Sequence, residues 1–114
     1  MQQLSGSELL QLHARRCADG SPPLLLLDVR EPWEVETAAI RIEGAGSVAI
    51  PMGQVPARLA EIDRAQPVVC ICHHGARSAQ VVAFLERSGF EAVYNLAGGV
   101  DAWSQQVDAR VPRY

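Results

Sequence analysis

The feature that most constrains the fold is a pair of short segments that are apolar at every position. One is Leu24–Leu27, closed by Asp28, and the other is Val68–Cys72, closed by the polar residues that follow it. A strand that is apolar on both sides needs cover on both faces, which is typical of a parallel sheet. The chain is therefore expected to adopt an α/β fold, with a central and mostly parallel five-stranded sheet flanked by helices on both faces.

The rest of the chain alternates between strand patterns and helical patterns. The further strands are predicted to end at Leu4 and to cover residues 47–50 and 92–96. The first helix is predicted to begin after Ser5, which forms a capping box with Glu8, and to stop at Gly20. The other predicted helices are 31–36, 54–62, 79–88 with Ser78 as its cap, and a short one carrying Ala102 and Trp103.

Length and composition limit the number of domains, the kinds of partner and the cellular compartment that we expect for this chain. A length of 114 residues with 48% apolar residues suffices for one packed core, so residues 1–114 are expected to form a single domain with an irregular tail at 107–114. The formal net charge is −3, and the ten basic residues are all arginines that are scattered apart from Arg15-Arg16, which argues against a nucleic-acid partner. The longest apolar run is far shorter than a membrane span, so no membrane partner is expected. Three cysteines and an N-terminus without a signal-peptide pattern favour a cytoplasmic protein.

The candidate chemistry lies at the end of the second apolar segment, where Cys72 is followed by a short polar turn. If residues 73–77 wind tightly, their backbone N–H groups converge near the Cys72 sulfur, and Gly75 permits the backbone angles that such a turn needs. The helix that follows adds partial positive charge, and Arg77 adds a permanent one. Because all these features stabilise an anion, the sequence predicts that Cys72 is a thiolate nucleophile with an anionic substrate held beside it.

Four segments resemble, in order, those of the rhodanese-like sulfurtransferase family. Residues 72–78 (CHHGARS) resemble the active-site loop of that family, and residues 28–34 (DVREPWE) match its DVRExxE segment. Gly44-Ala45 followed by Ile50-Pro51 resembles its GAxxIP segment, with four residues between the two pairs, and residues 95–103 (NLAGGVDAW) match its NLxGGxxxW segment. The resemblance spans nearly the whole chain, with one departure at residues 41–43 (RIE), where many members have His-Ile-Pro.

The resemblance implies a rhodanese-like fold and a sulfur-transfer reaction. Cys72 is implied to be the catalytic nucleophile, which takes the outer sulfur of a donor such as thiosulfate as a persulfide and passes it on. The implied partners are a small anionic sulfur donor and a thiol or protein acceptor, with no metal or organic cofactor, for a monomer or homodimer. Asp28 and Arg30 are implied to support the fold of the site, and we hypothesise that Arg30 pairs with a carboxylate such as Glu34. The implied substrate-binding residues are His73, His74, Gly75, Ala76, Arg77 and Ser78.

Two other functions stay open at this point. A cysteine phosphatase or arsenate reductase uses the same kind of nucleophile, although the related cell-cycle phosphatases place five residues between Cys and Arg and this chain places four. A sulfur-relay or sensing module carries a persulfide to a partner with little turnover of thiosulfate. Turnover assays with aryl phosphate, arsenate and thiosulfate separate these functions.

Simpler roles are predicted for several conspicuous residues. The run from Cys70 through Cys72 to His74 contains the ligand types of a zinc site, but no second Cys/His pair exists elsewhere, so no metal site is predicted. The remaining side chains are expected to be structural or solvated: Cys17 and Cys70 in the core, Trp33 and Trp103 in packing, and Glu31, Glu34 and Glu36 on a solvated face.

Overall fold

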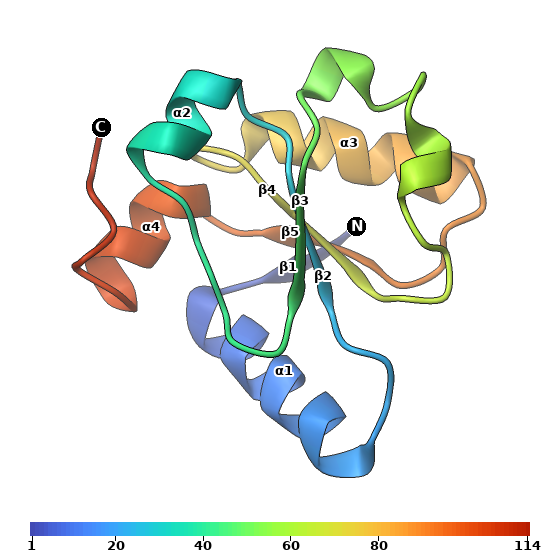
Figure 1. Cartoon of the computed structure of the whole chain (residues 1–114), viewed down its shortest axis with the longest axis horizontal. Coiled ribbons are helices and arrows are strands. Elements are labelled where there is room, and N and C mark those ends of the chain that lie inside the picture. Colours follow the sequence, from blue (N-terminus) through green and yellow to red (C-terminus); the bar gives the residue numbers. More distant parts are fainter.

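Five strands form one sheet in which every neighbouring pair is parallel, and this confirms the predicted fold class (Figure 1). The computed structural model describes all residues from 1 to 114. The strands lie in the order β1-β5-β4-β2-β3, so that β4 and β2 occupy the middle of the sheet. Their bounds are β1 Gln2–Leu4, β2 Leu25–Asp28, β3 Gly46–Ala49, β4 Val68–Ile71 and β5 Val93–Leu96.

Two apolar clusters, one on each face, cover the sheet as predicted. Alternation along β4 shows the division, because Val68 and Cys70 lie in one cluster while Val69 and Ile71 lie in the other. Helix α3 (Ala76–Arg87) packs on the first face, and α1 (Gly6–Asp19) and α4 (Gly99–Gln106) pack on the second. None of the helices is both long and apolar enough to cross a lipid bilayer.

The ends of α1 follow the predicted local rules. Ser5 accepts a hydrogen bond from the Glu8 amide, and the Glu8 carboxylate accepts one from the Ser5 amide, which completes the capping box. Gly20 ends the helix in the left-handed conformation with φ of 73°. The short helix α2 (Pro32–Thr37) begins with proline, as its sequence suggested.

The helix predicted over residues 54–62 is wrong. The structure has two 3₁₀ turns instead, at Met52–Gln54 and Leu59–Glu61. Pro56 has no N–H to donate to a carbonyl one turn back, and Arg58 leaves the helical region with φ of −113° and ψ of 21°. The amphipathic spacing therefore places the apolar side chains on the core without a continuous helix.

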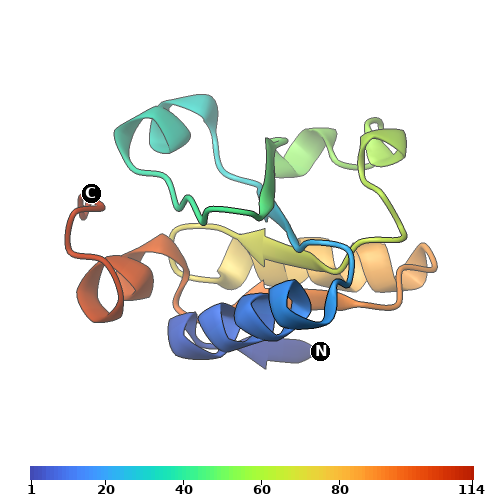
Figure 2. The same cartoon turned by 60° about the horizontal axis from the view of Figure 1, so that its bottom comes forward.

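Two further expectations are corrected by the structure. Helix α3 begins at Ala76, so its cap is Gly75 and Ser78 lies inside its first turn. Cys17 is exposed on α1 instead of lying in the core. Both tryptophans lie in packing as predicted, because Trp103 is buried and Trp33, 61% exposed on α2, packs edge-to-face on the Tyr114 ring. The tail after α4 contains no helix or strand, and it returns toward α2 (Figures 1 and 2).

Candidate active site

The candidate site lies at the carboxyl ends of the central strands, where a loop leaves β4 and enters α3. Such an edge is where ligands bind in open parallel sheets. Gly75 occupies the turn with φ of 105°, and a Cβ atom there would lie 3.4 Å from the Gly98 amide nitrogen. The left-handed backbone favours glycine at position 75, and a Cβ atom there would be in ordinary van der Waals contact. The turn carries the chain from Cys72 into α3 within four residues.

The Cys72 sulfur lies on the floor of this loop. Its Sγ accepts a hydrogen bond from the Gly75 amide at 3.0 Å, and the Ser78 hydroxyl oxygen lies 3.2 Å away and can donate to it. Cys72 is only 1% exposed, so the sulfur is more enclosed than a surface nucleophile.

The backbone around this sulfur presents several unused donors. Five loop and first-turn amides have no acceptor within the chain, those of His73, His74, Ala76, Arg77 and Ser78. Amides in the first turn of a helix lack intrahelical partners, and together with the helix dipole they form an anion-binding arrangement. The residues that the sequence predicted to bind substrate therefore do lie around Cys72.

A polar side chain on β5, that of Asn95, is hydrogen-bonded to the loop. Asn95 is buried, and its side-chain amide donates to the Gly75 carbonyl at 3.1 Å and to the Gln3 side chain at 3.0 Å. These bonds orient its carbonyl oxygen toward the Ser78 hydroxyl. The single hydroxyl proton can therefore serve Asn95 when Cys72 is a thiol and turn to the sulfur when Cys72 is a thiolate.

Arg77 is held by a carboxylate from α2. Its two terminal nitrogens donate to the two oxygens of Glu34 at 2.6 and 2.8 Å, so Glu34 is buried and not part of a solvated face. The bonds from Arg77, helped by those from the Tyr114 hydroxyl and the Glu31 amide, lower the pKa of Glu34 to about 2, although burial acts in the opposite direction. The Arg77 side chain is 35% exposed and keeps other N–H donors free.

Arg30 pairs with a carboxylate, as hypothesised, but this carboxylate belongs to Asp28 and not to Glu34. Its guanidinium donates to both Asp28 oxygens, at 2.9 and 2.6 Å, and to the backbone carbonyls of Glu34 and Ala38. The Arg30 side chain is fully buried and also donates to the Tyr114 hydroxyl at 2.8 Å. The pair therefore ties β2 to α2 and to the tail.

The two histidines of the loop stand at its rim. The His74 side chain is 67% exposed, whereas the His73 ring is stacked between the rings of His74 and Tyr114, with both centroid distances 4.0 Å. Burial is the main cause that lowers the pKa of His73. Cys70 lies in the core as predicted, and burial raises the pKa of its thiol to about 12, so Cys70 is a neutral packing residue at neutral pH.

Sequence reasoning missed the contributions of Glu34, Asn95 and Tyr114. The segments that resemble the family contain Glu34 and Asn95, and that signal could have marked both as site residues. No local pattern distinguishes Tyr114, since it lies in a segment without regular structure and meets Glu34 across 80 positions.

Comparison with known proteins identifies the type of domain. The model of the rhodanese-like domain family matches residues 8–106. The sulfurtransferase of Allochromatium vinosum is 37% identical over 92 residues, which are 81% of each protein. The thiosulfate sulfurtransferase GlpE of Pseudoalteromonas translucida is 29% identical, over 79% of this chain and 82% of that protein. The chain spans only 30% and 28% of two longer relatives.

The fold is also shared with solved structures. A rhodanese-related protein from Thermoplasma volcanium superposes with a TM-score of 0.76 at 26% identity, and the match covers 94% of each chain. The match extends beyond the loop to the whole sheet and its helices, so the parallel sheet and the position of the loop at its edge belong to one shared architecture.

Proposed function

Because this chain belongs to the rhodanese-like domain family, we propose that it moves sulfane sulfur from thiosulfate or a persulfide donor to a thiophilic acceptor through a persulfide on Cys72. The observation that carries the proposal is the Cys72 sulfur, which accepts a hydrogen bond from the Gly75 amide in a turn whose other amides have no acceptor in the chain. A buried structural cysteine needs no such turn. The similarity to a thiosulfate sulfurtransferase supports thiosulfate as one donor.

The proposed reaction has two displacement steps. The Cys72 thiolate attacks the outer sulfur of thiosulfate, the S–S bond breaks, and sulfite leaves with the bonding electrons. The acceptor thiolate then attacks the terminal sulfur of the Cys72 persulfide and regenerates the Cys72 thiolate. Sulfite is a good leaving group and both steps begin and end with anions, so the protein has to stabilise negative charge and needs no metal or organic cofactor.

The loop supplies that stabilisation in the proposed mechanism. The unused amides of residues 73–78 hold the oxygens of the donor, and later the terminal sulfur of the persulfide. Arg77 offers its remaining N–H donors while Glu34 fixes the orientation of its guanidinium. His73 and His74 border the entrance, and Asp28 and Arg30 support the loop from below. A monomer or homodimer in the reducing cytoplasm is the proposed setting.

Mass spectrometry of the intact protein tests the proposal. After incubation with thiosulfate, the wild-type chain should gain one sulfur atom, and a cyanide or thiol acceptor should remove it. Cys70→Ser should keep the gain because Cys70 is a neutral core residue, whereas Cys72→Ser should lose it completely. A sulfur gain that persists in Cys72→Ser would refute the proposed mechanism.

Sulfur loading, together with assays of phosphate-ester hydrolysis and arsenate reduction, separates the alternative functions. Rapid loading from a low-molecular-weight persulfide with slow loading from thiosulfate assigns the chain to sulfur relay. Hydrolysis of an aryl phosphate or reduction of arsenate, without any sulfur adduct, assigns it to the phosphatase or arsenate reductase class. The spacing of four residues between Cys72 and Arg77 favours the sulfur-transfer outcome.

Ser78→Ala should slow persulfide formation by about tenfold, because it removes one hydrogen bond to the reacting sulfur. Stopped-flow or quenched-flow loading with thiosulfate measures the rate. Ser104→Ala is the matched control, since Ser104 is also a buried serine whose hydroxyl is bonded, but to the Val111 carbonyl. Equal rates for Ser78→Ala and Ser104→Ala would show that the Ser78 hydroxyl has no role in the reaction.

A further inference from the structure

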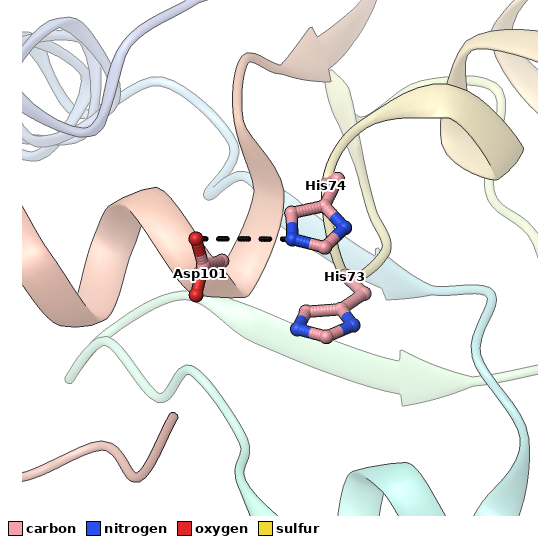
Figure 3. Close-up of side chains that lie close together, drawn as sticks. All are labelled: His73, His74 and Asp101. Atoms are coloured by element: carbon pink, nitrogen blue, oxygen red, sulfur yellow. Dashed lines mark ion pairs between the residues drawn. The ribbon is translucent and has the colours of Figure 1, made fainter. Parts of the chain in front are cut away.

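Three potential metal ligands from two segments meet beside the loop (Figure 3). His73 and His74 follow β4, and Asp101 lies in the first turn of α4. One ligand atom from each residue lies within 4.8 Å of the others, and the His74 Nε2 atom is 3.8 Å from a carboxylate oxygen of Asp101. The loop and α4 are tied together here, because the Asp101 amide donates to the His73 carbonyl at 3.1 Å.

One ring nitrogen of these histidines is buried without a hydrogen-bond partner. The Nε2 atom of His73 is buried and has no hydrogen-bond partner, and it is the only buried side-chain nitrogen or oxygen in the chain of which this is true. Leaving such a group without a partner is unfavourable, so an unpartnered buried nitrogen points to a ligand that completes it. The neighbouring His74 is 67% exposed, so an ion from solvent can enter beside it.

The ligand types select the class of ion. Two imidazoles and one carboxylate suit zinc, copper, nickel and ferrous iron, and they do not suit magnesium or calcium, which prefer oxygen ligands. Two ligand atoms of one tetrahedral zinc ion lie about 3.4 Å apart, so separations of up to 4.8 Å must contract. The exposed His74 ring can supply that movement by tilting out of its stack on His73.

We propose that His73, His74 and Asp101 bind one divalent transition-metal ion at the rim of the Cys72 loop, with solvent filling the remaining positions. The proposed sulfur transfer does not use this ion, so we do not propose the ion as a cofactor of that reaction. Asp101 already accepts hydrogen bonds from Arg113 and Gln105, at 2.9 and 2.8 Å, which hold its carboxylate in place beside the histidines. Supporting bonds of this kind orient metal ligands in known sites.

Titration of the reduced, full-length chain with Zn²⁺, followed by calorimetry, tests the proposal. One ion should bind, and Asp101→Asn should weaken the affinity at least tenfold. Asp108→Asn is the matched control, because Asp108 is also an aspartate paired with an arginine at 2.9 Å but lies away from the histidines. Asp101→Asn should still load sulfur on Cys72. Zn²⁺ affinity and sulfur loading are therefore independent measurements, and failure of one proposal does not decide the other.

Two further measurements keep the test decisive. Co²⁺ in place of Zn²⁺ should give a visible spectrum without a thiolate-to-metal charge-transfer band, in the wild type and in Cys17→Ser. His74→Gln, a change at an exposed side chain, should also weaken Zn²⁺ binding and serves if Asp101→Asn fails to fold. Equal affinities for wild type, Asp101→Asn and His74→Gln would overturn the site, as would a persistent thiolate band in Cys17→Ser.

Discussion

Gly99→Ala is expected to destabilise the chain by about 3 kcal/mol or more and to displace the loop that carries Cys72. The new Cβ atom would clash with the carbonyl oxygens of Cys72 and His73, since it would lie closer to both than real Cβ atoms ever do. These are backbone atoms, and the amides of α4 already hold both carbonyls, through Val100 at 2.9 Å and Asp101 at 3.1 Å. The clash can therefore be relieved only by moving the loop away from the helix.

Gly20→Ala is the control that separates this clash from backbone strain. Gly99 and Gly20 both have positive φ, of 60° and 73°, but no atom lies within 4 Å of a Cβ built at Gly20. The backbone strain alone should cost about 1–2 kcal/mol in Gly20→Ala. Chemical denaturation of both variants gives the difference, and sulfur loading of Cys72 should drop only in Gly99→Ala. Equal losses of unfolding free energy would contradict the close contact between α4 and the loop.

The fold could be predicted because its signals are local. A strand covered on both faces is apolar at every position, so β2 and β4 are visible as runs of the sequence. Capping is equally local, and Ser5 with Glu8 marked the start of α1 correctly. Residues 54–62 failed because apolar spacing reports which side chains face the core, while Pro56 decides whether the backbone there can form a continuous helix.

The candidate site could be predicted only in part, because its supporting contacts are remote in sequence. The order Cys72, Gly75, Arg77 is contained in one loop and was recognisable. Glu34 lies among other acidic residues, a pattern typical of a solvated face, and its burial depends on Arg77, 43 positions away. Only the topology brings α2 beside the start of α3, so no local rule identifies this pair.

Glu34→Gln is expected to reduce the unfolding free energy at pH 7 by about 3 kcal/mol. Glutamine keeps the size of the side chain but removes the charge that accepts two bonds from Arg77 and one from the Tyr114 hydroxyl. The magnitude follows from the pKa of Glu34, which lies at about 2 in the folded chain against 4.5 for an ordinary glutamate. Denaturant titrations of both proteins at pH 7 measure the difference. Glu61→Gln is the matched control, because Glu61 forms a similar pair with Arg58 in which both side chains are substantially exposed, so little change is expected.

The pKa of Glu34 predicts the direction in which its contribution to the unfolding free energy changes with pH. Since the folded-state pKa of Glu34 is below the ordinary value, the unfolded chain takes up the proton first as the pH falls. The stabilisation from the charged Glu34 is therefore complete above about pH 4.5, declines as the pH falls toward 2, and is absent below that. The difference in unfolding free energy between wild type and Glu34→Gln should shrink over this window, whereas other carboxylates titrate in both proteins and cancel. A difference that stays constant from pH 7 to pH 2 would mean that the charge of Glu34 does not stabilise the folded chain and that Arg77 is held in place by other contacts.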